Sequence, residues 1–447
     1  MTECLIDRNF QPMYLLFRRY REAVSQAADK NDFIVVVERT HGYNERFKAE
    51  VFVDEAPEAS QNPFFCERLV KTLLWIHGGY RLWIHASKPL FEQLQAAYSK
   101  GGSRDFDVRF MERVYGAPFE VIHVPDIEDL PASRPQKILA EGSLEGARIG
   151  FDAGGSDRKV AAVLDGEVLY SEEVVWHPKQ KSDPDYHIGH IRGAIMLAKS
   201  KLPRVDRLGV SSAGIYVDNE AKVASLFLKI PQDDYDRVRT VYIDIGKELG
   251  VPLKVANDGD VAALAGALEL GKNNLLGIAM GTSEAAGYID GKGALRGWLN
   301  ELAFVPVDAS PNAMEDEWST DIGVGVKYHS QDGIIKLAQM AGIRFEDHLS
   351  PAERLKVVQS RIENDDDTAR RIFEDAGVYF AYSLMYYRLF YSMDDVLLMG
   401  RVVSGKGGET LVETARRILD EHQIDVTIHL PDEKSRRVGQ AVAAASL

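Results

Sequence analysis

Two segments of this chain repeat one layout, and that repeat constrains the fold more than any other feature. The segments ARIGFDAGGSDRKVAAVLDGEVLY and NLLGIAMGTSEAAGYIDGKGALRG each predict an apolar strand, a Gly/Ser/Thr turn, a second strand, an Asp-Gly turn and a third strand. Gly150 and Gly154 of the first segment recur as Gly277 and Gly281 of the second at the same offset. Two copies of one meander, each opening half of a domain, predict a duplicated α/β fold with a cleft between the halves.

The part of the chain before the repeat predicts a further domain. At 447 residues the chain is longer than one ordinary core requires. Residues 1–145 alternate amphipathic helices with β-rich runs such as DFIVVVERT and RLWIHA, which predicts an accessory α/β domain. We expect this domain to pack against the first half of the repeat, joined to it by the proline-rich segment PDIEDLPASRPQ.

Composition limits the classes of function. The chain has 45% apolar and 27% charged residues and no apolar run long enough to cross a bilayer, and its N-terminus lacks the pattern of a signal peptide. We therefore expect a cytoplasmic protein without a membrane partner. The formal net charge of −15 argues against a nucleic-acid partner. Two cysteines are too few for a disulfide framework or a cysteine-based zinc site, so no zinc is expected.

The first turn of the repeat has the composition of a phosphate-binding loop. Gly154 and Gly155 let backbone N–H groups approach an anion, Ser156 adds a hydroxyl donor, and Lys159 adds a positive charge. Asp152, at the end of the preceding strand, is placed to hold Mg²⁺ through water. An ordinary hairpin turn is the alternative interpretation.

Two further glycine turns predict the rest of a nucleotide site. Gly281 and Thr282 follow the first strand of the second repeat and are expected to face the first turn. Gly400 and Gly405 lie between an apolar strand and a helix, which suits an adenosine or ribose pocket. The heptapeptide GRVVSGK also fits the start of a Walker A loop, but Gly407 follows it instead of Ser or Thr.

A strand-to-helix corner between the two repeats carries the candidate base. In LKVANDGDVAALAGALELG a strand ends at Asn257 and Asp258, and a helix follows for which Asp260 is the expected N-cap. A carboxylate at such a corner can accept a proton from a substrate hydroxyl. Alternatively, Asn257 and Asp258 are only turn and cap residues.

The order of these four elements resembles that of the ROK family (repressors, open reading frames and sugar kinases) of the actin-like ATPase superfamily. The resemblance covers about residues 147–447 and rests on several short matches. These are Asp152–Lys159, the stretch LGVSSAGIYV, Asn257-Asp258 with the Ala-rich helix, Gly281-Thr282, Ala376-Gly377, Gly400 and Gly439.

The resemblance implies a duplicated, two-lobed actin-like (ribonuclease H-like) kinase core. Its lobes would span residues 146–262 and 263–447, with a C-terminal helix that can return to the first lobe. It implies ATP and Mg²⁺ as cofactors and a sugar or polyol as substrate, in a possible homodimer. Asp258 would be the catalytic base, and the substrate would be bound by Asn257, Glu301, Ser212 and Gly214.

Three departures from the family pattern bear on substrate and catalysis. Phe304 stands where the family has a histidine, and the zinc motif is missing. Val326 stands at the position of a sugar-binding glutamate, so substrate identity is expected to differ. Glu284 would repel a phosphate at the second turn unless Mg²⁺ or a lysine intervenes. Replacement ligands are expected from Glu315–Trp318, or from His329 and Gln331. A solvated loop is the alternative interpretation of Glu315–Trp318.

Two classes of function stay open at this level. Retention of Asp152, Asn257, Asp258 and Glu301 favours an ATP-dependent carbohydrate kinase, because a protein that only binds ligands needs no base. The alternative is a non-catalytic sensor of sugar or nucleotide, or a degenerate ROK protein that only binds nucleotide. A DNA-binding repressor is disfavoured, because only one clear helix precedes the first hairpin.

Overall fold

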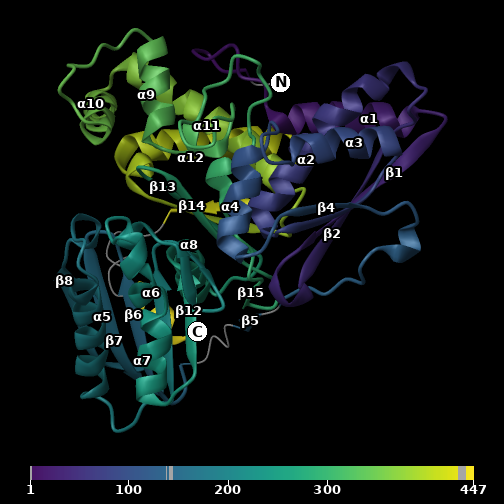
Figure 1. Ribbon diagram of the computed structural model, residues 1–447. Helices are drawn as coiled ribbons and strands as arrows, with labels where there is room; N and C mark the ends of the chain where they lie inside the picture. Colours follow the sequence, from purple (N-terminus) through teal and green to yellow (C-terminus); the bar gives the residue numbers. More distant parts are fainter. Residues whose placement is uncertain (1–2, 137, 140–143, 431–438) are drawn as a thin grey trace. The chain divides into compact units, whose positions relative to one another are not determined.

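The computed structural model describes residues 3–136, 138–139, 144–430 and 439–447, and these fall into two compact units (Figure 1). Unit 1 consists of Met1–Gln136, Ile278–Ala285 and Gly297–Ile428. Unit 2 consists of Lys137–Gly277, Ala286–Arg296 and His429–Leu447. The three-part division with boundaries after residues 145 and 262 stays a prediction, since the compact units divide the chain elsewhere.

Unit 2 is built on a five-stranded sheet with the order β12-β9-β6-β7-β8. The first repeat forms β6 (Ala147–Ala153), β7 (Asp157–Leu164) and β8 (Glu167–Val175), an antiparallel meander. The strands β9 (Arg207–Ser212) and β12 (Leu253–Asn257) extend it in parallel with β6. The small hairpin of β10 (Ile215–Val217) and β11 (Glu220–Val223) follows β9.

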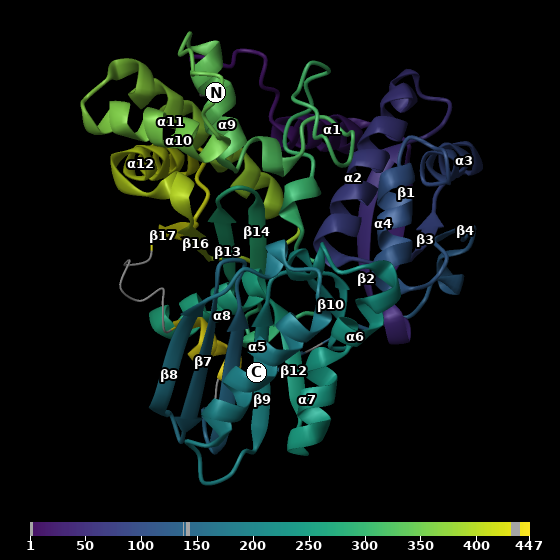
Figure 2. The same ribbon diagram turned by 60° about the vertical axis from the view of Figure 1, so that its left-hand side comes forward.

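Helices cover both faces of this sheet, because the side chains of β7 alternate between two apolar clusters. Val160 and Ala162 lie in a core with residues of α5 (Pro184–Lys199), whereas Ala161 and Val163 pack with α13 (Gly439–Ala445). The helices α6 (Tyr235–Arg239) and α7 (Val241–Leu249) add to the α5 side, which faces the viewer in Figure 2. The helix α8 (Asp258–Leu270) contacts α13.

Two glycines of the sheet allow α13 to lie directly on it. A Cβ atom on Gly150 would stand 1.8 Å from the carbonyl oxygen of Ala441, and one on Gly209 would stand 1.7 Å from that of Ala444. Only glycine fits at such an approach. The C-terminal helix thus belongs to the unit that carries the first repeat.

The second repeat forms the same meander as the first. It supplies β13 (Leu275–Met280), β14 (Glu284–Ile289) and β15 (Ala294–Leu295) to a six-stranded sheet with the order β17-β16-β13-β14-β15-β5. The other strands are β16 (Asp395–Met399), β17 (Thr427–His429) and β5 (Ile138–Leu139). The duplicated α/β architecture expected from the sequence is confirmed.

The N-terminal part of unit 1 contains a four-stranded sheet with the order β2-β1-β3-β4. Its strands are β1 (Lys30–Glu38), β2 (Asn44–Phe52), β3 (Arg81–His85) and β4 (Glu120–His123). Its helices are α1 (Met13–Gln26), α2 (Asn62–His77), α3 (Lys88–Ala97) and α4 (Asp105–Tyr115). The runs DFIVVVERT and RLWIHA form β1 and β3, as expected from the sequence.

Four more helices complete unit 1: α9 (Gln331–Met340), α10 (Pro351–Glu363), α11 (Asp367–Tyr387) and α12 (Gly405–Glu421). The N-terminal residues are tied to α11, where the Asp375 carboxylate accepts the backbone N–H groups of Leu5, Ile6 and Asp7 at 2.7–3.1 Å. The N-terminal part thus packs in the same compact unit as α11. The expectation that it packs against the first half was wrong, because its N-terminal residues bind α11, which belongs to unit 1.

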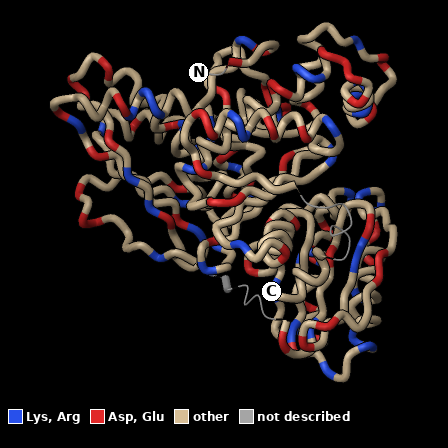
Figure 3. The backbone as a smooth tube through the Cα atoms, turned by 180° about the vertical axis from the view of Figure 1, so that it is seen from behind, with Lys and Arg blue, Asp and Glu red and all other residues tan. Residues whose placement is uncertain are grey.

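Charge and hydropathy add little to this architecture. Acidic and basic residues are interspersed along the chain of both units (Figure 3). None of the described helices combines the length and the apolar character that a membrane-spanning helix requires.

Candidate active site

Three parallel strands of unit 2 bring the candidate catalytic residues to one edge of the sheet. In the register of β6 and β9, Asp152 pairs with Ser211, and in that of β9 and β12, Ser212 pairs with Asn257. Asp258 follows directly as the first residue of α8. The carboxyl ends of parallel strands are where open α/β sheets bind ligands.

Asp152 is a buried carboxylate held by two neighbours. Its Oδ1 accepts a hydrogen bond of 2.6 Å from the Ser211 hydroxyl, and its Oδ2 lies 3.6 Å from the Lys159 ammonium. Burial raises the pKa of Asp152, although both neighbours act to lower it. Lys159 also pairs with Asp157 at 2.9 Å, so its ammonium is turned back onto carboxylates.

The first glycine turn has a lysine beside it that the sequence did not reveal. A Cβ atom on Gly155 would lie 3.1 Å from the Lys179 ammonium nitrogen, so this charge stands next to the turn. The Gly154 carbonyl accepts a 2.9 Å hydrogen bond from the Trp176 indole, and the Ser156 hydroxyl donates to Asp157 at 3.1 Å. No local motif marks Lys179, because only the folding of β8 returns it to the turn.

Asn257 fixes the corner at which Asp258 stands. Its side-chain oxygen accepts the Gly259 N–H at 2.7 Å, and its amide donates to the Gly214 carbonyl at 2.6 Å. Asn257 is therefore the N-cap of α8, and the expectation of Asp260 in that role was wrong. The helix starts three residues earlier than an Asp260 cap predicts, and its first turn lies close to β14: a Cβ atom on Gly259 would stand 2.4 Å from the Ala286 carbonyl.

The environment of Asp258 moves its titration toward neutral pH. Burial and, second, the negative charge of Asp152 raise the pKa of Asp258 from 3.8 to about 6, while the Gly259 N–H and Lys179 act to lower it. The residue keeps part of its surface exposed. A reachable carboxyl with a pKa near the working pH is suited to general base catalysis.

Ser212 and Gly214 lie close to this corner but have structural partners. The Ser212 hydroxyl is buried and shares hydrogen bonds with the hydroxyls of Tyr216, at 2.6 Å, and Tyr242, at 3.0 Å. Gly214 has a φ of 131°, and a Cβ atom there would stand 2.5 Å from the Val223 carbonyl. The sequence offered no signal for Tyr216 and Tyr242, which reach Ser212 only in the fold.

In unit 1, two of the predicted nucleotide turns lie side by side. Gly400 has a φ of 102°, and a Cβ atom there would stand 2.2 Å from the carbonyl of Met280, the residue before Gly281. The Gly281 carbonyl accepts the Gln331 N–H at 2.9 Å, and Thr282 is exposed. The turn of Gly281 and Thr282 and the Gly400 turn can therefore serve one ligand.

Gly405 begins α12, whose N-terminus already holds an anion from the protein. The Glu363 carboxylate accepts the Lys406 N–H at 2.8 Å and would stand 2.5 Å from a Cβ atom on Gly405. Helix N-termini attract such negative charge. This arrangement gives no support to a Walker A loop at GRVVSGK.

Glu284 lies inside unit 1 and does not border the second turn as a charge. It is 3% exposed, and neither carboxyl oxygen has a hydrogen-bond partner among the described residues. Burial, with the Glu301 carboxylate as the second cause, raises its pKa well above 4.5. The neutral form is thus favoured, and the expected repulsion of a phosphate was wrong because the strand turns this side chain inward.

The residues that replace the family pattern are also largely interior. The Phe304 ring packs 4.3 Å from the Trp75 ring. His329 is buried with Nε2 2.8 Å from the Ser383 hydroxyl, and burial lowers its pKa to about 3. Gln331 is 4% exposed. In the segment Glu315–Trp318, Asp316 is buried, whereas Glu315, Glu317 and Trp318 are exposed.

The donor set at Asp152 fits a magnesium ion carried by a nucleotide. Within the described part of the chain, no three His, Cys, Asp or Glu side chains gather closely enough to hold a metal by themselves. Mg²⁺ bound with phosphates requires only one or two protein carboxylates and keeps several waters. Asp152, with one oxygen facing only an ammonium 3.6 Å away, meets that requirement.

Comparison with solved structures identifies the fold. A ROK hexokinase from Thermus thermophilus matches with 18% identity and a TM-score of 0.53 over 67% of this chain and 97% of its own. A putative N-acetylmannosamine kinase from Listeria monocytogenes matches with 16% identity and a TM-score of 0.50 over 67% and 98%. A ROK family transcriptional regulator, described as a homologue of the E. coli MLC protein, matches with 17% identity and a TM-score of 0.50 over 68% and 78%.

No family model and no curated protein sequence matches this chain. At such low identities the structural matches establish architecture. The chain has the duplicated, two-lobed actin-like fold of the ROK sugar kinases, as the sequence motifs implied. About a third of the chain lies outside these matches, which cover 67–68% of it.

Proposed function

We propose that this protein transfers the γ-phosphoryl group of ATP to a hydroxyl of a sugar or sugar-like polyol, with Asp258 as the general base. The observation that carries the proposal is the placement and titration of Asp258. It starts a helix at the carboxyl edge of three parallel strands, and its pKa of about 6 leaves it largely ionised at neutral pH.

The chemistry assigned to Asp258 is a single proton transfer. As the substrate oxygen attacks the γ-phosphorus, the Asp258 carboxylate accepts the hydroxyl proton, the bond to the bridging oxygen breaks, and ADP leaves. Asn257 supports this step by fixing the backbone at Gly259 and Gly214 through hydrogen bonds of 2.7 and 2.6 Å. Positioning of this kind supplies most of the catalysis in phosphoryl transfer.

The glycine turns are assigned to the nucleotide. Gly154, Gly155 and Ser156 in unit 2, and Gly281 and Thr282 in unit 1, offer backbone N–H and hydroxyl donors for phosphates. Gly400 adjoins the second of these turns. Asp152 would hold the magnesium ion through water, and the ion would neutralise charge on the phosphates. Lys179 is an additional cation for the same phosphates.

The substrate is a polyhydroxylated carbohydrate whose contacts differ from those of typical hexose kinases. Glu301 is assigned to the substrate hydroxyls, whereas Phe304 and Val326 provide no hydrogen bonds where the family pattern has polar side chains. A site that lacks such partners discriminates less strongly between substrates that carry the corresponding hydroxyls and substrates that lack them. We therefore propose a substrate with fewer polar contacts on that side.

The test is a turnover assay with matched variants. Purified protein is incubated with ATP, Mg²⁺ and a panel of hexoses, amino sugars, uronic acids and polyols, and ADP release is followed. Asp258→Asn should lower kcat by about 10²–10⁴-fold, the range typical of a lost general base. Asp260→Asn, two residues further along α8, is the control and should retain activity. Equal turnover by wild type and Asp258→Asn would remove the base from its role.

A non-catalytic sensor is the second candidate, because the transcriptional regulator described above shares this fold. In that case the panel would yield no ADP release, while calorimetry would detect binding of a sugar or of ATP. Binding without turnover by the wild-type protein would replace the kinase proposal with this one.

A further inference from the structure

The carbonyl groups at the end of α2 bind the segment that carries Glu301. The last four carbonyls of a helix have no partner within the helix. In α2, the Leu74 carbonyl accepts the Gly78 N–H at 2.8 Å, the Trp75 carbonyl accepts the Glu301 N–H at 3.0 Å, and the Ile76 carbonyl accepts the Asn300 N–H at 2.9 Å. The His77 carbonyl accepts from Arg39 at 3.3 Å. The helix end and the segment thus satisfy each other.

Arg39, which directly follows β1, and Glu45 of β2 hold the same segment from its N-terminal side. Arg39, which is 2% exposed, donates to the Gly297 carbonyl at 2.6 Å. The Trp298 indole donates to the Glu45 carboxylate at 2.9 Å, and the Trp298 ring meets the His77 ring edge-on at 4.4 Å. Arg39 and Glu45 are themselves an ion pair at 3.7 Å. Gly297 and Trp298 are therefore fixed by elements of the N-terminal sheet.

Asn300 needs such support because its backbone is unfavourable. Its φ of 52° lies in the left-handed region, which few residues other than glycine adopt. The Ile76 carbonyl holds its N–H group, and its side-chain oxygen accepts the Tyr391 hydroxyl at 3.0 Å. The orientation of the neighbouring Glu301 therefore depends on contacts made by α2.

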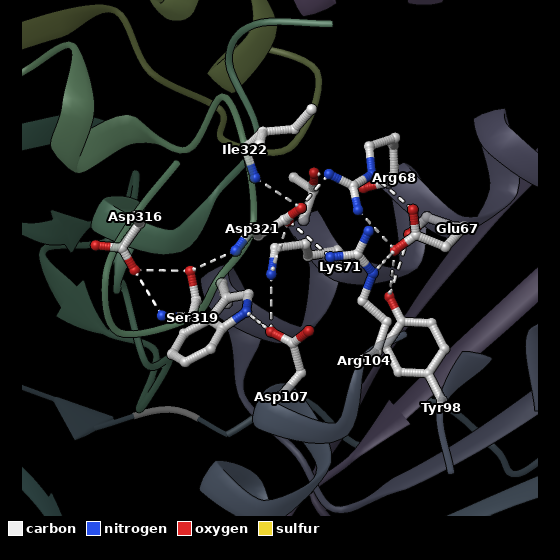
Figure 4. Close-up of polar contacts among 12 residues, drawn as sticks. Glu67, Arg68, Lys71, Tyr98, Arg104, Asp107, Asp316, Ser319, Asp321 and Ile322 are labelled. Atoms are coloured by element: carbon white, nitrogen blue, oxygen red, sulfur yellow. Dashed lines mark hydrogen bonds and ion pairs between the residues drawn. The ribbon is translucent and has the colours of Figure 1, made fainter. Parts of the chain in front are cut away.

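A buried ion-pair network keeps α2 itself in place (Figure 4). Lys71, on α2, lies 2.9 Å from Asp107 of α4 and 3.1 Å from Asp321. The Trp75 indole donates to Asp107 at 2.5 Å, and Arg68 donates to Asp321 at 3.0 Å. Charges with such low exposure are retained only when paired in this way. The network therefore makes α2 a rigid support.

We infer that the end of α2, with Arg39 and Glu45, forms a positioning element that sets Glu301 for contact with the sugar. The N-terminal sheet and α2 then support the substrate site and are not an appended domain. This inference rests on the proposed function in its assignment of Glu301 to the substrate. Its geometric part, the ordering of Gly297–Glu301 by the N-terminal sheet, stands without that assignment.

The test uses Arg39→Met in the full chain, with Arg81→Met as the matched control. Arg81 lies in the same sheet and pairs with Glu38 and Glu120, with no contact to Gly297–Glu301 in its ion pairs. Arg39→Met should raise the KM for the sugar about tenfold, with kcat and the KM for ATP within about twofold of wild type. Arg81→Met should leave all three unchanged. A uniform fall in kcat, or equal KM values in the two variants, would overturn the inference.

Hydrogen exchange separates a failure of this inference from a failure of the proposed function. The peptide with the amides of Asn300 and Glu301 should exchange about tenfold faster in Arg39→Met than in wild type or Arg81→Met. Trp298→Phe, which loses the indole donor to Glu45 but keeps an aromatic ring beside His77, should accelerate the same peptide and serves if Arg39→Met does not fold. Unchanged exchange in the folded variants would overturn the positioning role. Faster exchange in a protein that phosphorylates no sugar would overturn the proposed function alone.

Discussion

Replacing Asp258 with asparagine should stabilise the protein while removing its activity. Its pKa rises from 3.8 to about 6 on folding, and a rise of that size corresponds to about 3 kcal/mol against the ionised form. The folded-state pKa of this acid lies above the unfolded one, so the native state is at no disadvantage below pH 3.8. The disadvantage grows as pH rises from 3.8 toward 6 and is complete above that range. Asparagine keeps the shape and the oxygen acceptor but never ionises.

Differential scanning fluorimetry of wild type and Asp258→Asn at pH 4.5 and pH 7.5 measures this effect. About 3 kcal/mol corresponds to roughly 6–12 °C in Tm for a unit of 150–250 residues. With an unfolded pKa of 3.8, about 1 kcal/mol of the penalty is already present at pH 4.5. The variant should therefore gain about 2 kcal/mol, or roughly 4–8 °C in Tm, more at pH 7.5 than at pH 4.5. The transition that moves should be that of unit 2. A Tm difference that is the same at both pH values would refute the assigned burial and charge environment of Asp258.

Three further substitutions test other parts of the structure by thermal or chemical unfolding. Glu284→Gln should raise Tm at pH 7 but have little effect near pH 4.5, because the raised pKa of Glu284 penalises the native state only where the unfolded carboxyl is ionised. An equal gain in Tm at both pH values would contradict the burial of that carboxyl. Lys71→Met should cost about 3–5 kcal/mol, since it leaves Asp107 and Asp321 buried beside each other without the ammonium, and a cost below about 1 kcal/mol would count against the network. Gly150→Ala should lower the free energy of unfolding by about 1–3 kcal/mol, because its Cβ would stand 1.8 Å from the Ala441 carbonyl and would force α13 away from the sheet. An unchanged Tm would show that α13 does not lie there.

The duplicated fold and the Asp258 corner could be predicted because their signals are local. Gly-rich turns, alternating apolar residues and a cap such as Asn257 act over a few neighbouring positions. The exact cap was missed because Asp260 is as good a capping residue as Asn257. In the fold, the Asn257 side chain accepts the Gly259 N–H group, and Gly259 lies against the Ala286 carbonyl of β14. The contact between α8 and β14 has no signal in the local sequence.

The parts that could not be predicted depend on contacts between distant residues. Lys71 and Asp321 are about 250 positions apart, and charged residues in a helix are usually interpreted as solvent-facing. The contact of Lys179 with Gly155 and that of Ser211 with Asp152 likewise join residues that no local motif connects. For Glu284, the position in the sequence was misleading. A carboxylate next to a phosphate turn suggests repulsion of the phosphate, but β14 directs this side chain into the interior of unit 1.

The pH dependence of kcat/KM for sugar phosphorylation tests the central claim most directly. Wild type should show activity that rises with pH through an apparent pKa of about 6, the value at which Asp258 loses its proton. Asp258→Asn should abolish the rise, because an asparagine side chain has no carboxyl group to titrate. An unaltered rise in Asp258→Asn would contradict the assignment of Asp258 as the base.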